Sequence, residues 1–298
     1  MDAFLAWMTD LSGGLSGAPF WLPLAWAALI AVAIAMYVIL DGFDLGVGIL
    51  YRSAGDHEWR DRMMLAVAPM WDGNETWLIL GGAGLFAVFP LAYALIMPAL
   101  YIPVILMLLA LIFRGVAFEF RFKAEKSRFV WDLSFYLGSL VATFSQGVVL
   151  GAFVQGIATS DGTFTGGRFD WLAPFPILTA LGLVAGYGLL GACWVVLKTE
   201  GDLEAFGRRR ARQFLLATIV LMGAVSLAVP FLGTTIQDRW FAFPNILVLS
   251  PVPILTALVA FALWRSLSNP AAVARPFVLA ICLFLLGYLG LGISLFPY

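Results

Sequence analysis

Long apolar segments separated by short polar segments dominate the pattern of this chain. A helix needs about 20 predominantly apolar residues to cross the hydrocarbon core of a membrane. Eight segments reach that length if the second and third are divided at Phe89-Pro90, because proline is tolerated at the start of a helix. The sequence therefore predicts an all-α, polytopic bundle of transmembrane helices, whose eight spans cover about 22–50, 65–89, 91–113, 131–156, 171–197, 213–232, 246–267 and 273–296.

Lysine and arginine lie in every second loop. Fifteen of the 17 fall in or beside the loops after the first, third, fifth and seventh spans, Arg114 among them, and only Arg168 and Arg239 lie on the other side. Cytoplasmic loops carry such an excess, so we expect the basic loops in the cytoplasm and both termini outside. The first twenty residues hold Asp2 and Asp10 but no basic residue, which favours an uncleaved anchor over a signal peptide.

Composition agrees with a membrane protein. Hydrophobic residues make up 62% of the 298 residues and charged residues 12%, about half of the roughly 25% that soluble domains carry. A formal net charge of −1 gives no reason to expect a nucleic-acid partner. The loops are too short for a soluble domain. We therefore expect residues 1–298 to form a single integral membrane domain, with spans one to four over about 22–156 and spans five to eight over about 171–296.

Four acidic residues fall inside the predicted spans, namely Asp41, Asp44, Asp72 and Glu75. Asp41 and Asp72 each lie about 15 Å from the basic loop between them, if both helices continue unbroken at 1.5 Å per residue. Each pair has i, i+3 spacing and so shares one helix face. The two spans are joined by a short loop, and we expect them to be antiparallel neighbours that bring all four carboxyl groups together.

A charge at the centre of a bilayer costs about 2.5–3.5 kcal/mol. The four acids must therefore face protein or water, and a proton or cation pathway is one interpretation. The alternative is structural, with the acids capping or cross-linking broken helices, and Asp72-Gly73-Asn74 is a sequence that breaks helices. Trp71 and Asn74 flank the acids and are expected to pack and cap. Gln146 lies among small residues in the fourth span, where helix packing is expected and a ligand pocket is the alternative.

The sequence offers few ligands for a redox centre. Its one histidine, His57, lies in a predicted cytoplasmic loop, so no pair of histidines can hold a haem inside the membrane. Cys193 and Cys282 lie in separate apolar runs and lack the spacing of a metal site. The residues alone thus favour either a transporter or a cofactor-free subunit of a larger membrane enzyme.

Two long motifs contain the four acids and help to decide between a transporter and a subunit of a membrane enzyme. They are Asp41-Gly-Phe-Asp44, within the longer segment 37–48, and Trp71-Asp-Gly-Asn-Glu-Thr-Trp77. Further motifs follow in the same order at 81–90, 113–121, 131–132, 138–139, 146–151 and 294–298. Together these segments strongly resemble subunit II of the cytochrome bd-type quinol oxidases, including their cyanide-insensitive branch.

The resemblance implies a subunit of a respiratory complex in the bacterial inner membrane. Its haem-bearing partner, subunit I, would hold haems b and d, oxidise quinol and reduce oxygen to water, while this chain would bind no haem. Family members pair these two subunits, and the resemblance leaves open a small third subunit and a bound structural quinone or lipid. Subunit II of the family has nine spans, in two four-helix bundles and one extra helix, so we expect the ninth to be absent here.

The resemblance also implies roles for the acids. Subunit II supports the complex and contributes part of a proton path from the cytoplasm. The acids of the family motifs fall on Asp41, Asp44 and Asp72, whereas Glu75 belongs to a variable position of the second motif. Trp71, Asn74 and Gln146 would support this path. The competing hypothesis is a proton-coupled membrane transporter, which would be active as a single chain.

Overall fold

Most of the described residues are helical in a computed structural model of the protein, which describes residues 17–232, 240–241 and 243–295. Residues Asp2, Asp10 and Arg239 and the end of the last motif, 296–298, lie outside the described residues. The predicted all-α class is confirmed. The helices are α2 (Ala18–Tyr51), α3 (His57–Leu65), α4 (Trp71–Val88), α5 (Pro90–Phe120), α6 (Arg128–Gln155), α7 (Pro174–Lys198), α8 (Asp202–Ala228), the 3-10 turn η1 (Val229–Phe231), α10 (Asn245–Leu249), α11 (Pro251–Leu267) and α12 (Arg275–Leu295); a short antiparallel hairpin, β1 (Thr159–Ser160) and β2 (Thr163–Phe164), precedes α7.

Seven helical segments of the described chain are long and apolar enough to cross a membrane. The predicted second span, 65–89, is the exception, because the helix is interrupted at 66–70 and restarts as α4. Pro69 lies in this interruption, where its ring removes a backbone donor and disfavours helical geometry in the residue before it. The first turns of α4 then carry Asp72, Asn74 and Glu75. The helix break therefore comes before Asp72-Gly73-Asn74, which the sequence had suggested as the breaking element.

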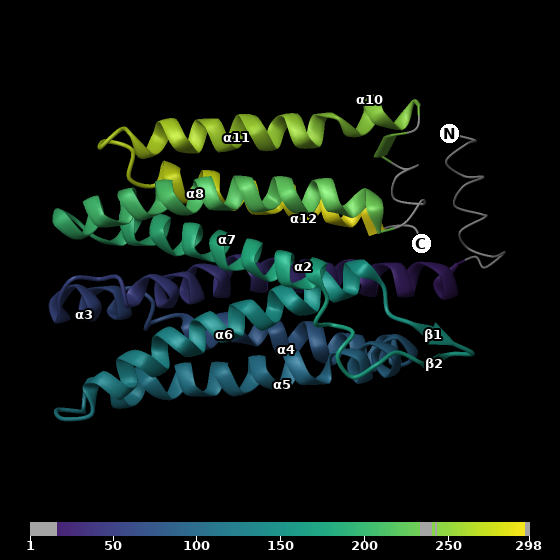
Figure 1. Cartoon of the computed structure of the whole chain (residues 1–298), viewed down its shortest axis with the longest axis horizontal. Helices are drawn as coiled ribbons and strands as arrows, with labels where there is room; N and C mark the ends of the chain where they lie inside the picture. Colours follow the sequence, from purple (N-terminus) through teal and green to yellow (C-terminus); the bar gives the residue numbers. More distant parts are fainter. Residues whose placement is uncertain (1–16, 233–239, 242, 296–298) are drawn as a thin grey trace.

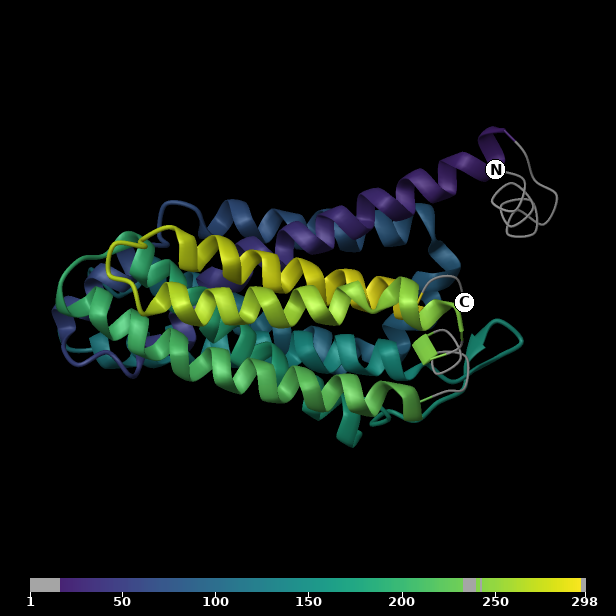
Figure 2. The ribbon, with the colours of Figure 1, turned by 90° about the horizontal axis from the view of Figure 1, so that it is seen from above.

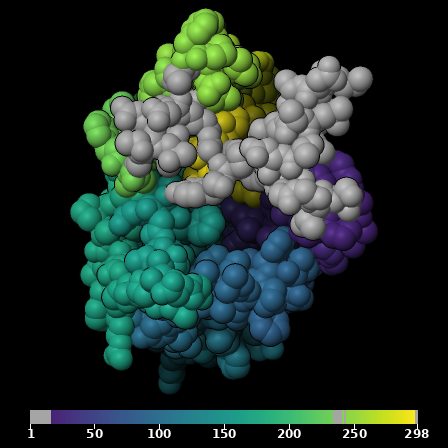
Figure 3. Space-filling model, turned by 90° about the vertical axis from the view of Figure 1, so that its right-hand side faces the viewer, coloured from purple at the N-terminus to yellow at the C-terminus, as the bar shows by residue number. Residues whose placement is uncertain are grey.

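The long helices form two groups of four (Figure 1). Helices α2, α4, α5 and α6 contact one another, as do α7, α8, α11 and α12. The groups are joined by contacts of α7 with α2 and α6 and of α12 with α2. Viewed from above, the first part of α2 projects beyond the neighbouring helices (Figure 2). An end-on view shows the green and yellow segments of the second group on one side and the blue segments of the first group on the other (Figure 3).

Glycines allow the two groups to approach at the level of the backbone. A Cβ atom at Gly46 of α2 would lie 2.7 Å from the backbone nitrogen of Gly191 of α7, and one at Gly151 of α6 would lie 2.5 Å from the Cα of Pro176. Within the first group, a Cβ at Gly138 would lie 2.7 Å from the Ala110 carbonyl oxygen. Small residues at such crossings let membrane helices pack closely, which agrees with the packing expected for the fourth span.

An aromatic cluster also connects the groups. The rings of Phe43 (α2) and Trp194 (α7) stack with centroids 4.1 Å apart, and Phe277 (α12) packs edge-on against Phe43. The indole nitrogen of Trp194 donates a hydrogen bond of 3.1 Å to the carbonyl of Ala66, in the interruption before α4. A side chain of the second group therefore binds the backbone just before α4 begins.

The basic loops gather at one end of the molecule, the end on the left of Figure 1. Arg208 of α8 donates hydrogen bonds to the carbonyls of Asn269 and Pro270 in the loop between α11 and α12, and Arg62 reaches the carbonyl of Glu200. The basic loops, which are every second loop along the sequence, thus lie together at one end of the molecule. The side of the membrane that this end faces stays a prediction.

Candidate functional site: buried acids around an arginine

Asp41 and Asp44 lie on the inward face of α2, and neither has any exposed surface. Asp41 precedes the end of α2 at Tyr51 by ten residues, which corresponds to about 15 Å along the helix axis. Apolar residues of the core, including Leu45 and Val47, surround this part of the helix. Two carboxyl groups are therefore placed deep inside a largely apolar bundle.

The start of α4 lies beside these acids. Asn74 donates a hydrogen bond of 2.6 Å from its side-chain amide to Asp44, and a longer one of 3.3 Å to the carbonyl of Leu40. The Trp71 ring stacks on Phe118 of α5 with centroids 4.8 Å apart. These contacts place the first turn of α4 at the depth of Asp44, between α2 and α5.

The four acids do not all meet, contrary to the expectation from their spacing. Glu75 is partly buried and turns toward α5, whereas Asp72 is exposed on the surface of this chain. The reason is the helix break, because α4 begins at Trp71 and Asp72 falls in its first turn, on the outer side. Asp72 still interacts electrostatically with Glu75. The structure thus places Asp41, Asp44 and Glu75 together and Asp72 beside them at the surface.

Arg114 completes this cluster, although the sequence pattern placed it at the end of the third span, beside the loop that follows. Helix α5 continues to Phe120, two turns beyond its predicted end, so Arg114 lies within the helix and is fully buried. Its Nη1 atom is 3.0 Å from Glu75 Oε1 and 3.9 Å from Asp41 Oδ1. One available signal was the spacing of the two arginines. Arg114 precedes Arg121 by seven residues, which puts both on the same face of the helix if it continues past residue 113.

Several polar atoms of the cluster lack hydrogen-bond partners in the described part of the chain. They include both carboxyl oxygens of Asp41, one of Asp44, and the Nε and Nη2 atoms of Arg114. Buried polar atoms are normally paired, and an unpaired buried charge is strongly disfavoured. One guanidinium also cannot neutralise three carboxylates. The arrangement therefore suits groups that take up and release protons.

A second polar layer lies one helical turn from Asp41. Gln146 of α6 donates a hydrogen bond of 2.7 Å to the hydroxyl of Tyr37 and accepts one of 3.0 Å from Tyr187 of α7. Gln146 therefore connects three helices across the two groups. Sequence reasoning missed both tyrosines, although Tyr37 precedes Asp41 by four residues and so lies on its face of α2.

A separate ionic cluster closes the basic end of the first group. Asp132 accepts hydrogen bonds from Arg121 Nε at 2.5 Å and from the Tyr51 hydroxyl at 3.0 Å. Asp61 of α3 accepts hydrogen bonds from Arg121 and Arg128. Partial burial raises the pKa of Asp61, but the hydrogen bonds from these two arginines outweigh burial and hold the pKa below its usual value. These acids have cationic partners, which indicates a structural role in joining α3, α5 and α6.

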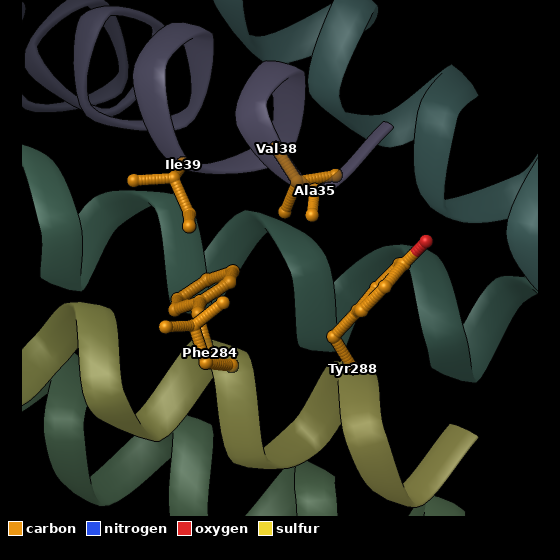
Figure 4. A pocket seen from close by; sticks show the side chains of 6 residues that line it. Ala35, Val38, Ile39, Phe284 and Tyr288 are labelled. Carbon is orange, nitrogen blue, oxygen red and sulfur yellow. The ribbon is translucent and has the colours of Figure 1, made fainter. Parts of the chain in front are cut away.

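The structure offers little for a cofactor within this chain. Within the described residues, no group of three or more His, Cys, Asp or Glu side chains is arranged to hold a metal ion. His57 is exposed in the first turn of α3, at the basic end. These residues do not fit an intramembrane haem. A small, shallow and mostly apolar crevice lies between α2 and α12. It is lined by Ala35, Val38, Ile39, Phe284, Leu285 and Tyr288 (Figure 4).

The fold and the cluster together define a polytopic α-helical membrane protein with charged residues buried between its helices. The family model for cytochrome bd terminal oxidase subunit II matches residues 22–298. The chain therefore belongs to this family, which confirms the resemblance seen in its motifs.

Two similar proteins support this assignment. The chain is 34% identical over 214 residues to cytochrome bd-I ubiquinol oxidase subunit 2 of Escherichia coli K12, an alignment that covers 69% of this chain and 56% of the relative. It is 35% identical over 208 residues to cytochrome bd ubiquinol oxidase subunit 2 of Bacillus subtilis, covering 68% and 60%. The matched part thus spans little more than half the length of these relatives.

A solved structure shares the fold. A chain of the bd oxidase from Geobacillus thermodenitrificans superimposes with a TM-score of 0.78 over 93% of this chain and 85% of that one, at 16% sequence identity. This likeness supports the helical architecture.

Proposed function

We propose that this chain is the haem-free subunit II of a quinol-oxidising, oxygen-reducing complex in a bacterial inner membrane. In this proposal its buried acids carry protons from the cytoplasm toward the oxygen-reducing haems of a larger partner subunit. Membership of the subunit II family supports this role, as do the relatives named as ubiquinol oxidase subunits. Quinol is the substrate of the whole complex, and the basic loops face the cytoplasm.

The observation that carries the proposal is the cluster of Asp41, Asp44 and Glu75 around Arg114. Buried charges that are not fully compensated are strongly unfavourable, and well-packed apolar residues in their place are often neutral or stabilising, so packing alone does not account for these acids. A proton is the smallest species that neutralises a buried carboxylate. A group of carboxyls with a shared cation is therefore suited to proton transfer, whereas nothing in it resembles a redox centre.

The partner's position follows from Asp72. This acid is exposed on the isolated chain, at the depth of Asp44, and a charge at that depth facing lipid is unfavourable. Large apolar side chains of α4 are exposed about two turns further along the helix, among them Ile79 and Leu80. We infer that the partner subunit covers this face of α4, so that protons pass from the cluster into the partner. Haems b and d belong to that partner, because this chain's only histidine lies exposed at the basic end.

The test compares two buried aspartates. Asp41→Asn keeps the size of the side chain and its capacity for hydrogen bonding but removes the exchangeable proton, so oxygen consumption per haem should fall by about tenfold or more. Asp132→Asn is the matched control, since Asp132 is nearly as buried but lies in the ionic cluster at the basic end. It should alter assembly, scored as haem content, and leave turnover per haem unchanged. Normal turnover per haem in Asp41→Asn would refute the proton path.

Co-purification distinguishes an oxidase subunit from a proton-coupled transporter. A tagged chain should bring down a larger subunit and show haem absorbance in stoichiometric amount. A colourless chain that is active by itself in liposomes would instead establish the transporter and overturn the proposed function.

A further inference from the structure

Arg114 lies between the outer and inner carboxyls of the cluster. The side chain of Glu75, on its outer side, keeps 23% of its surface exposed, whereas Asp41 and Arg114 have none. A single guanidinium nitrogen, Nη1, makes the hydrogen bond to Glu75 and is also the atom closest to Asp41, at 3.0 Å and 3.9 Å respectively. A displacement of about 1 Å would therefore exchange one partner for the other, within the usual range of hydrogen-bond lengths.

The rest of the guanidinium is free to make such a shift. Its Nε and Nη2 atoms have no hydrogen-bond partner among the described residues. Its carbon lies 5.4 Å from the ring centroid of Phe118 and 5.9 Å from that of Phe135. Aromatic rings attract a guanidinium without fixing the direction of its hydrogen bonds. The side chain is thus confined laterally and is not fixed to one acid.

We propose that Arg114 is a positioning residue that transfers its ion pair from Glu75 to Asp41 when Glu75 takes up a proton. This inference rests on the proposed proton path and assigns its controlling residue. Arginine stays protonated in proteins, so Arg114 donates no proton. When Glu75 becomes neutral, the guanidinium pairs with the Asp41 carboxylate. When the proton reaches Asp41, the guanidinium returns to the Glu75 carboxylate, and the path is ready for the next proton.

The pH dependence of such a path depends on every ionisable group near the guanidinium. Helix α2 contributes two acids and a tyrosine, α4 contributes the partly buried acid and the exposed one beyond it, and α7 contributes a tyrosine that interacts with Asp41. These groups are Tyr37, Asp41, Asp44, Asp72, Glu75 and Tyr187.

Arg114→Lys tests the exchange in the assembled oxidase. Lysine keeps the positive charge, but its compact ammonium lacks the planar fork of a guanidinium. We expect haem content like that of the parent, turnover per haem lower by about tenfold, and a pH profile of turnover displaced to higher pH. The displacement follows because the shorter lysine side chain holds its charge farther from one of the two acids, and a carboxyl whose neighbouring cation lies farther away holds its proton to higher pH.

Arg121→Lys is the matched control. Arg121 is equally buried at the end of the same helix, but its partners are Asp61 and Asp132 in the ionic cluster of the basic end. This variant should lower thermal stability and leave the pH profile of turnover per haem unchanged. An Arg114→Lys variant with parental turnover and a parental pH profile would overturn the exchange.

A second variant covers the case in which Arg114→Lys fails to assemble. The double variant Arg114→Gln with Glu75→Gln removes a cation and its hydrogen-bonded anion together, so the net charge of the cluster is unchanged. The exchange predicts that assembly recovers while turnover per haem stays low. Recovery of both would make Arg114 purely structural and would overturn the proposal. Failure of the proton path itself is recognised separately, by normal turnover per haem in Asp41→Asn.

Discussion

The contact between Gly46 and Gly191 gives a prediction whose size follows from the structure. A Cβ atom introduced by Gly46→Ala would lie 2.7 Å from the Gly191 backbone nitrogen, and the Tyr187 carbonyl is nearer still. These neighbours are backbone atoms, so rotation of a side chain cannot relieve the clash. Helices α2 and α7 must move apart by about 1 Å to relieve these contacts, which loosens the joint between the two helix groups.

The cost is estimated from two opposing effects. Overpacking a close-packed interior costs about 1–3 kcal/mol, occasionally more. Alanine is better than glycine in a helix by about 1 kcal/mol, which offsets part of that cost. Contacts this close with backbone atoms put the overpacking cost at the upper end of that range, so the net loss is about 2 kcal/mol. A loss of 1 kcal/mol lowers the unfolding midpoint by about 2–4 °C in a protein of a few hundred residues.

The assay is thermal unfolding of the purified complex in detergent, followed by tryptophan fluorescence. Gly223→Ala in α8 is the control, because a Cβ atom there would have no described atom within 4 Å; its midpoint should equal that of the parent or slightly exceed it. A Gly46→Ala protein as stable as Gly223→Ala would refute the inferred backbone contact.

Two further predictions concern the ends of the helices. The low pKa of Asp61 in the folded protein means that its ion pairs with Arg128 and Arg121 contribute at neutral pH, above its usual pKa of about 3.9, and that this contribution is lost as pH falls through the folded-state value. Asp61→Asn should therefore be less stable than the parent in thermal unfolding at pH 7, and the difference should close on acidification; a difference that widens would contradict this assignment. Trp194→Phe keeps the stack on Phe43 but removes the hydrogen bond to Ala66, and should cost about 1 kcal/mol in unfolding free energy; an unchanged midpoint would show that the bond contributes nothing.

Helix content could be predicted from the sequence because membrane spans depend on a local property. Runs of about 20 apolar residues identify a span without knowledge of its neighbours. The segment 65–89 was read as one such run because its apolar residues outnumber the polar ones. The structure interrupts it before α4, where Pro69 breaks the helix and Trp194 of a distant helix binds the free Ala66 carbonyl. The hydrogen bond from Trp194 is a tertiary contact, so no local sequence pattern predicts it.

The site was predicted only in part, because local patterns can be read from the sequence and tertiary contacts cannot. Asp41 and Asp44 were recognised because acids are rare within apolar runs. Arg114 was read as the end of a span, since its acidic partner Glu75 is 39 residues away in the sequence. Asp72 was expected among the other acids, because i, i+3 spacing implies a shared face. That argument assumes an unbroken helix, whereas Asp72 lies in a first turn where one face points outward.

Proton uptake by the complex during oxygen reduction tests the central claim most directly. The fully reduced complex is mixed with oxygen, while a pH-sensitive dye reports proton uptake and haem absorbance reports electron transfer. If the acids around Arg114 carry the protons, Asp41→Asn should retain the first haem oxidation and slow proton uptake by about tenfold or more, while Asp132→Asn behaves like the parent. Proton uptake at the parental rate in Asp41→Asn would contradict the account.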